Sequence, residues 1–339
     1  MMLVTSLLLA GLAAAQTDSL LSGIEAFQKG DYPAAERLLR EAAKPGGDER
    51  AHAFLALTLA ATSRCPQAEP ALVKASGGAS ANIARLAGLS LAQCYIAAGR
   101  IDDASHVLRG LRAKAPADAD VLYQTARLHM RAWNDTIYQL YQKNPSSFRV
   151  NQLSGEILET QGQFAEAVAE YRKAMAKNPR ALNLHFRTGR ALLMSSHAPE
   201  MLDEARKEFE AELALNPSDA VAHYQVAQIL ITRQNPTEAA PRLQRALELK
   251  PDFSEALIAL GKLRLDDRKN DEAISLLQRA VRLVPASESA RYSLMMAYRN
   301  AGRMDEARRE KAELDKLQKV PEGEFSEFLK KLGEKQPDK

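Results

Sequence analysis

The sequence lacks the strong charge of one sign that marks many nucleic-acid-binding proteins. Its 46 Lys and Arg residues nearly balance 43 Asp and Glu residues, which leaves a formal net charge of +3 over 339 residues. A dedicated nucleic-acid-binding protein would carry a larger basic excess, gathered into a patch or a stripe. The near-neutral charge therefore argues against that class, and we expect no nucleic-acid partner.

Common catalytic signatures are also absent. The sequence contains no phosphate-binding G-x-x-x-x-G-K-[ST], no H-E-x-x-H, no C-x-x-C and no G-x-S-x-G motif. Carboxylate pairs such as Glu156 and Glu159 are common on helical surfaces, and nothing marks them as an acid/base couple. We therefore expect a protein that is not an enzyme and that uses no cofactor or metal.

Helix-breaking residues and long apolar runs are scarce. Only 17 Gly and 15 Pro residues occur, while Ala, Leu, Arg, Glu and Gln are abundant and favour helices. An apolar content of 46% excludes a disordered chain. Beyond the N-terminus, no stretch approaches the ~18 to 20 uninterrupted apolar residues that span a bilayer. The composition predicts an all-α protein without a stable membrane span.

The N-terminus resembles an export signal. An apolar run at 7–12 is followed by Ala13, Ala14 and Ala15 before Gln16, which is typical of a cleavage site. The basic residues that usually precede such a run are missing, so a buried N-terminal helix is the alternative. We predict that 1–15 is a signal peptide and that the chain is exported, to the periplasm or to the extracellular space.

Regularly spaced prolines reveal internal repeats. Pro145, Pro179, Pro217, Pro251 and Pro285 are separated by 34, 38, 34 and 34 residues, a spacing typical of helical-hairpin repeats. Extended backward, this spacing predicts nine hairpins, of which the fourth is short, with 133–140 as a truncated second helix. The predicted repeats start at 16, 49, 85, 119, 148, 182, 220, 254 and 288, and the last ends at 321.

Small residues recur where two helices of a hairpin must approach closely, because a larger side chain would hold the helix axes apart. On the first helix these residues are Gly155, Gly189, Ala227 and Gly261, and on the second helix Ala167, Ala205, Ala239 and Ala273. Turns between the helices are marked by Gly30, Gly99, Gly162 and Gly302.

This pattern resembles the tetratricopeptide repeat family. One repeat matches the family's small, aromatic, large-apolar and Pro positions with Gly155, Phe164, Ala167, Tyr171, Ala174 and Pro179. The resemblance implies an all-α, right-handed superhelical solenoid of about nine hairpins with a C-terminal capping helix. The chain then divides into the signal peptide 1–15, partly degenerate repeats at 16–147, regular repeats at 148–321, and a capping helix with a charged tail at 322–339.

The resemblance also implies where a partner binds. Stacked hairpins form an extended concave surface lined by the first helices, and the family's repeat positions place particular side chains in that groove. An apolar stripe beside a partly cationic one suits an extended peptide with apolar anchors and acidic groups. The alternative is that these side chains only help neighbouring helices to pack. The groove residues are Phe186, Arg190, Tyr224, Gln228, Ile258, Lys262, Tyr292 and Met296.

Two functions are compatible with this reading. The favoured one is a non-catalytic scaffold that binds an extended protein or peptide segment in the groove. The alternative is an accessory subunit of an envelope enzyme or transport complex, in which the groove packs permanently on one large partner. The sequence leaves the oligomeric state open.

Two histidines, His185 and His223, occupy the same position in adjacent repeats. They could form a metal pair, or they could be partly buried polar aromatics at a position that prefers large side chains. The second interpretation is favoured.

The only two cysteines, Cys65 and Cys94, are predicted to form a disulfide. An exported protein permits the bond, and an even count leaves no unpaired thiol. Cys65 is expected near the start of one helix and Cys94 in the later half of its antiparallel neighbour, so both fall toward the same end of the repeat array. Two buried free thiols are the alternative.

Overall fold

The computed structural model describes residues 17–44, 48–196 and 198–318, whose regular structure is entirely helical. The predicted signal peptide at 1–15 and the predicted capping helix at 322–339 lie outside these ranges. No helix within the described ranges is both long enough and apolar enough to cross a membrane.

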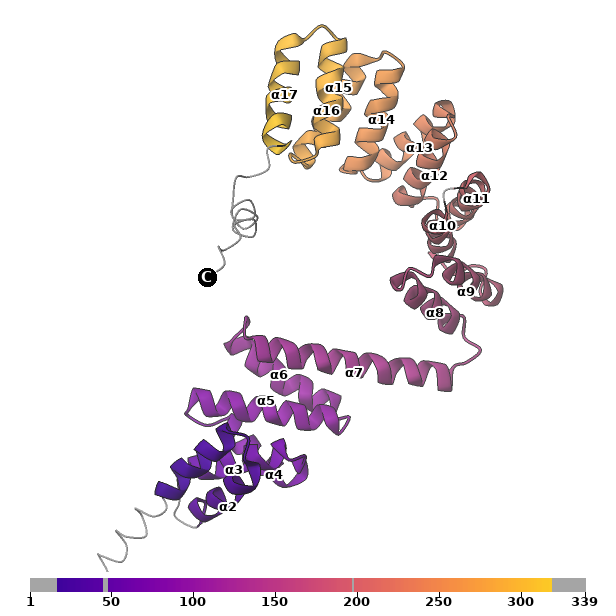
Figure 1. Cartoon of the computed structure of the whole chain (residues 1–339). Helices are drawn as coiled ribbons and strands as arrows, with labels where there is room; N and C mark the ends of the chain where they lie inside the picture. The colour runs from indigo at the N-terminus through magenta and orange to yellow at the C-terminus, as the bar shows by residue number, and fades with distance from the viewer. Residues whose placement is uncertain (1–16, 45–47, 197, 319–339) are drawn as a thin grey trace, which may run out of the picture. The chain divides into compact units, whose positions relative to one another are not determined.

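Helical residues 17–28 come first, and sixteen labelled helices follow them (Figure 1). In chain order these are α2 (Tyr32–Ala42), α3 (Glu49–Ala61), α4 (Cys65–Ser76), α5 (Ala81–Ala97), α6 (Ile101–Lys114), α7 (Ala119–Lys143), α8 (Phe148–Thr160), α9 (Phe164–Lys177), α10 (Leu184–Ser195), α11 (Pro199–Leu215), α12 (Ala220–Thr232), α13 (Pro236–Leu249), α14 (Ser254–Asp266), α15 (Asn270–Leu283), α16 (Glu288–Asn300) and α17 (Met304–Gln318).

The chain divides into two compact units, and the boundary in sequence falls between Asn144 and Pro145. Unit 1 contains three hairpins, residues 17–28 with α2, α3 with α4, and α5 with α6, followed by the long helix α7. Unit 2 contains five hairpins, from α8 with α9 to α16 with α17. From α2 onward, every helix packs against the next one along the chain within its unit. The predicted all-α fold of stacked helical hairpins is confirmed.

A single left-handed residue makes most of the turns within hairpins. It lies fourteen residues after the predicted repeat start in seven of the repeats. Four of these residues are the predicted glycines Gly30, Gly99, Gly162 and Gly302, with φ between 72° and 78°. Three others, Ser63, Gln234 and Arg268, adopt the same conformation with φ of 61°, 55° and 62°. A left-handed residue is the common way to end a helix abruptly, so this position sets the hairpin.

The fourth repeat differs from the prediction, because 119–143 form one continuous helix, α7, of 25 residues. The predicted second helix at 133–140 is therefore wrong. Trp133 occupies the place where seven repeats have Gly, Ser, Gln or Arg in the left-handed conformation, and an aromatic side chain disfavours that conformation. Residues 129–136 also contain no Gly or Pro that would break the helix. Within the described ranges the chain thus has eight hairpins and one unpaired long helix.

The small residues lie where the sequence places them, between the two helices of each hairpin. Ala167, Ala205, Ala239 and Ala273 have no exposed surface. A β-carbon added to Gly155 would lie 2.5 Å from Cε1 of the Tyr171 ring, and one added to Gly261 would lie 2.7 Å from Cγ of Leu277. The close approach of the two helices therefore requires glycine at these positions.

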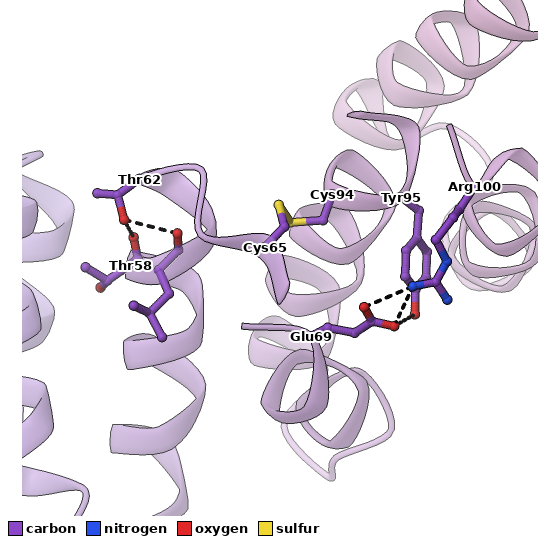
Figure 2. The surroundings of a disulfide bond; sticks show 8 residues. Thr58, Thr62, Cys65, Glu69, Cys94, Tyr95 and Arg100 are labelled. Atoms are coloured by element: carbon purple, nitrogen blue, oxygen red, sulfur yellow. Dashed lines mark hydrogen bonds and ion pairs between the residues drawn. A yellow bond between two sulfur atoms is a disulfide. The ribbon is translucent and has the colours of Figure 1, made fainter. Parts of the chain in front are cut away.

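Cys65 and Cys94 form a disulfide that joins the first residue of α4 to the later half of α5, with their Cα atoms 5.5 Å apart (Figure 2). A polar cluster nearby supports the same contact. Glu69 of α4 accepts hydrogen bonds from the Tyr95 hydroxyl at 3.1 Å and from Arg100 at 2.8 Å. The Arg100 guanidinium also lies over the Tyr95 ring, 4.2 Å from its centroid. Covalent and polar links thus hold the second repeat to the third.

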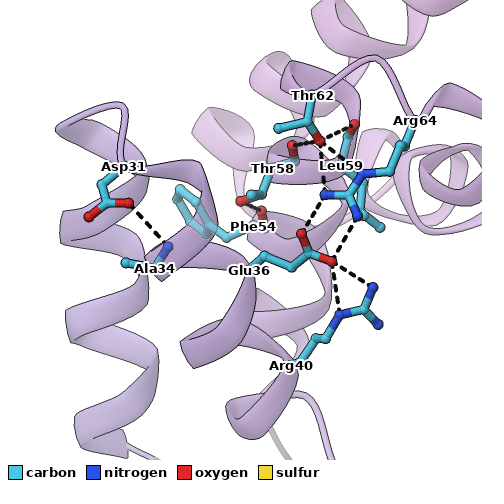
Figure 3. A network of polar contacts seen from close by, with 9 residues as sticks. All are labelled: Asp31, Ala34, Glu36, Arg40, Phe54, Thr58, Leu59, Thr62 and Arg64. Atoms are coloured by element: carbon cyan, nitrogen blue, oxygen red, sulfur yellow. Dashed lines mark hydrogen bonds and ion pairs between the residues drawn. The ribbon is translucent and has the colours of Figure 1, made fainter.

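A second polar network joins the first repeat of unit 1 to the second (Figure 3). The Glu36 carboxylate of α2 pairs with Arg64, which precedes α4, and with Arg40 one turn along α2. Hydrogen bonds from Arg64 and then from Arg40 lower the pKa of Glu36 to about 2. The Thr62 hydroxyl accepts a further bond from Arg64 at 3.1 Å, which fixes the guanidinium beside the turn of the second hairpin.

Candidate partner-binding face

The candidate face is formed by the first helices of unit 2, α8, α10, α12, α14 and α16. Side chains just before three of these helices cap their free amides. The Ser147 side chain accepts a hydrogen bond from the amide of Arg149. In the same way Asp219 accepts one from Val221, and Ser287 accepts one from Ala290. These caps fix where the helix begins and therefore which side chains reach the face.

Helix α10 is capped differently. Asn183 has φ of 69° and its side chain makes no capping bond. The fully buried carboxylate of Glu212, on α11, instead accepts hydrogen bonds from the amides of Asn183 at 2.8 Å and Phe186 at 3.3 Å. The positive end of the helix dipole favours this negative charge. Glu212 thereby positions Phe186.

The apolar row contains Phe186, Tyr224, Ile258 and Tyr292, one from each successive first helix. The first three are half-buried and pack on the core of unit 2. The Phe186 ring lies 5.4 Å from that of Phe209, and the Tyr224 ring lies 4.9 Å from that of Phe253. Tyr292 is 53% exposed. The row therefore both packs the helices and presents apolar surface.

Burial also raises the pKa of one member of this row. Desolvation raises the pKa of the Tyr224 phenol above its ordinary value of 10.0, and the nearby charge of Glu255 adds to the effect. The Tyr224 hydroxyl is therefore a neutral hydrogen-bonding group at physiological pH.

The neighbouring row contains Arg190, Gln228, Lys262 and Met296. Arg190 pairs with Glu159 of α8 at 3.0 Å, so its charge is balanced within the chain. Lys262 is exposed and donates a hydrogen bond to the Ser289 hydroxyl at 3.0 Å, and no carboxylate of the described chain forms an ion pair with it. Gln228 and Met296 are half-buried. The cationic character expected of this row is thus concentrated at Lys262.

The two equivalent histidines make separate contacts. His185 Nδ1 lies 2.7 Å from a carboxylate oxygen of Glu208, whose hydrogen bond raises the pKa of the imidazole. His223 is buried, which lowers its pKa, and its Nε2 lies 3.2 Å from the carbonyl oxygen of Pro217. Within the described ranges, no group of three or more His, Cys, Asp or Glu side chains is placed to hold a metal ion.

Unit 1 contains a cavity of about 790 Å³ between α3, α4 and the start of α5, which the sequence did not reveal. Its charged walls are paired with one another. Arg50 contacts Asp48 at 2.6 Å, and Lys74 contacts Glu49 at 3.0 Å. The remaining walls include several alanines, so the cavity presents little specific chemistry.

Comparison with known proteins identifies the repeats. Two family models, both described as tetratricopeptide repeat, match the chain, one at 64–128 and the other at 154–197, 202–257 and 258–315. No curated protein sequence matches the chain.

Solved structures of similar fold include "Crystal structure of MamA protein", with 20% identity and a TM-score of 0.46 over 50% of this chain and 91% of that one. "Crystal structure of YrrB: a TPR protein with an unusual peptide-binding site" has 22% identity and a TM-score of 0.47 over 57% and 97%. MamA from Desulfovibrio magneticus RS-1 has 18% identity and a TM-score of 0.47 over 52% and 97%. Likenesses this distant carry no argument about function.

The segments that match the family models contain the repeat features seen in the structure. The matched segments reach into both units, and they contain five of the seven left-handed turn residues, together with the close-packed small residues of unit 2. The chain belongs to the tetratricopeptide repeat family.

Proposed function

We propose that the face formed by the first helices of unit 2 binds an extended segment of a protein partner, without catalysing a reaction. Tetratricopeptide repeats are a protein-interaction fold that is typically non-catalytic, which supports the general role. The observation that carries the specific proposal is the apolar row. Helices α10, α12, α14 and α16 each carry one apolar side chain at the equivalent position. The first three of these side chains are half-buried, and the fourth, Tyr292, is 53% exposed.

The partner segment is expected to carry apolar side chains and at least one carboxylate. The apolar row offers anchoring contacts, while Lys262 offers a positive charge with which no carboxylate of the described residues forms an ion pair. Recognition of an extended segment by alternating apolar and charged contacts fits this arrangement. Arg190 contributes little to this charge because Glu159 already neutralises it.

We also propose that the protein acts outside the cytoplasm. The apolar run at 7–12 and the small residues after it support export. The pairing of Cys65 with Cys94 supports an oxidising compartment, because structural disulfides persist mainly there.

The proposal is tested by affinity capture of partners from the native cell envelope, with the captured proteins identified by mass. We expect Tyr292→Ala and Lys262→Glu each to weaken capture of the same partner while the melting temperature stays unchanged, since both side chains are exposed. Tyr224 is a poorer probe because it packs on Phe253.

Matched controls lie on the second helices of the same unit. Leu283→Ala removes an exposed apolar side chain of α15, and Lys207→Glu reverses an exposed charge on α11. If the controls weaken capture as much as Tyr292→Ala and Lys262→Glu do, the binding site does not lie on the first helices.

A further inference from the structure

Helix α7 is apolar on two opposite faces. One face packs within unit 1, where Val121 and Leu128 are buried and α5 and α6 are the neighbouring helices. The other face contains residues spaced alternately three and four apart over most of the helix. These are Tyr123, Ala126, Met130, Trp133, Ile137 and Leu140.

This second face is largely uncovered. Tyr123, Met130 and Trp133 are 63%, 64% and 52% exposed, and Ile137 and Leu140 are half-buried. In the described hairpins the first helix is paired with a second helix of its own repeat. In this repeat Trp133 replaces the turn residue, α7 continues, and no such second helix forms. The uncovered apolar face of α7 is therefore the face on which the second helix of this repeat would pack.

The spacing specifies the kind of occupant. Apolar residues at alternating intervals of three and four form the a and d positions of a heptad, which pack against another α-helix. An extended segment would meet side chains at a period of two and would not match this stripe. The occupant is therefore a helix with a similar apolar seam.

The same stripe is self-complementary when two copies run antiparallel. The two-fold axis then passes between Met130 and Trp133. This pairing places Tyr123 against Leu140 of the second copy and Ala126 against Ile137 of the second copy. Each layer then joins an a position of one helix to a d position of the other. Ala126, the smallest side chain of the stripe, packs against the β-branched Ile137 of the second copy.

The flanking positions are compatible with this pairing. Arg127 meets Asn134 of the second copy, and His129 meets Thr136 of the second copy, so no two like charges face each other across the seam. Like charges at such flanks would destabilise the pair.

We propose that the chain forms a two-fold symmetric dimer in which this outer face of α7, residues 123 to 140, pairs antiparallel with the same face of a second copy. A two-fold interface uses one surface patch twice, which a self-complementary stripe satisfies. Six layers form an interface near the lower end of the standard size, so we expect a dimer that dissociates on dilution.

Sedimentation velocity of the full chain over a wide range of concentration tests the dimer. The mass is expected to rise from one chain to two, and Trp133→Asp should weaken dimerisation at least tenfold. The matched control is Tyr138→Asp, because Tyr138 is 67% exposed on the same helix but lies outside the stripe. A chain that stays monomeric throughout, or a dimer that tolerates Trp133→Asp, overturns the proposal.

The only tryptophan of the chain is Trp133, so its fluorescence reports on this face. Its emission should shift to the blue as dimer forms. A blue-shifted emission that does not depend on concentration would mean that the chain itself covers the face, and this result also overturns the proposal.

Cysteine crosslinking tests the orientation. Under mild oxidation, a mixture of Ala126→Cys and Ile137→Cys chains should give a linked dimer, whereas Ala126→Cys alone should not. Efficient linkage of Ala126→Cys to itself would indicate parallel helices and contradict the antiparallel pairing.

Discussion

Removal of the disulfide should destabilise unit 1 selectively. The bond joins residues 29 apart in sequence, and on the chain-entropy model closing a loop of that length stabilises the fold by about 3 to 4 kcal/mol. The perturbation is the double variant Cys65→Ala/Cys94→Ala, which leaves no free thiol. Cys94 is buried, so loss of its sulfur adds a packing cost to the entropic one.

The structure also predicts where the loss appears. Hydrogen exchange should become faster in α3, α4 and α5, because the disulfide holds α4 against α5. Unit 2 should keep its exchange rates, since stability in repeat proteins is a sum of local and nearest-neighbour terms. The contacts of Glu69 with Tyr95 and Arg100 remain in the variant, so α4 should stay helical.

Exchange rates are the appropriate assay, because an array of repeats need not unfold in a single step. Wild-type protein reduced before exchange serves as the control and should resemble the double variant. Unchanged exchange in α4 and α5, or an equal loss of protection in unit 2, would refute the reasoning.

Two further predictions concern packing and charge. Gly155→Ala should destabilise the chain by about 1 to 3 kcal/mol in urea denaturation, because the new methyl group would collide with the Tyr171 ring. Gly110→Ala, in α6, is the matched control and should stabilise by about 0.5 to 1 kcal/mol, since no atom lies within 4 Å of the added β-carbon; equal effects would contradict the packing account. The pKa of Glu36, lowered to about 2 from 4.5 by Arg64, means that the ionised carboxylate stabilises the fold above pH 4.5 and that this contribution disappears as the pH falls toward 2. Thermal melts of wild type and Glu36→Gln should therefore differ most above pH 4.5 and converge near pH 2, and a difference that grows on acidification would have the wrong sign.

The repeat boundaries could be predicted because their causes are local. Small residues and turn glycines recur at fixed distances, and each has a packing or backbone reason that the sequence alone displays. The exception, Trp133, is informative in the same terms. The length of this repeat predicted a short hairpin. Trp133 at the turn position disfavours the left-handed turn, and residues 119–143 form one continuous helix instead.

The candidate face was less predictable because its chemistry depends on residues distant in sequence. Arg190 is neutralised by Glu159, and Phe186 is positioned by Glu212, and neither carboxylate belongs to the same helix as its partner. A periodic pattern assigns residues to a face but does not show which charges on that face are already paired. Only the structure shows that Lys262 forms no ion pair with a carboxylate of the described residues, whereas Arg190 does.

Selection from a displayed peptide library tests the central claim most directly, with the wild-type chain and the double variant Lys262→Glu/Tyr292→Ala as parallel targets. The account predicts that the wild type enriches peptides with spaced apolar residues and at least one Asp or Glu, and that the variant fails to enrich them. Enrichment of the same peptides by both targets would contradict a binding site on the first helices of unit 2.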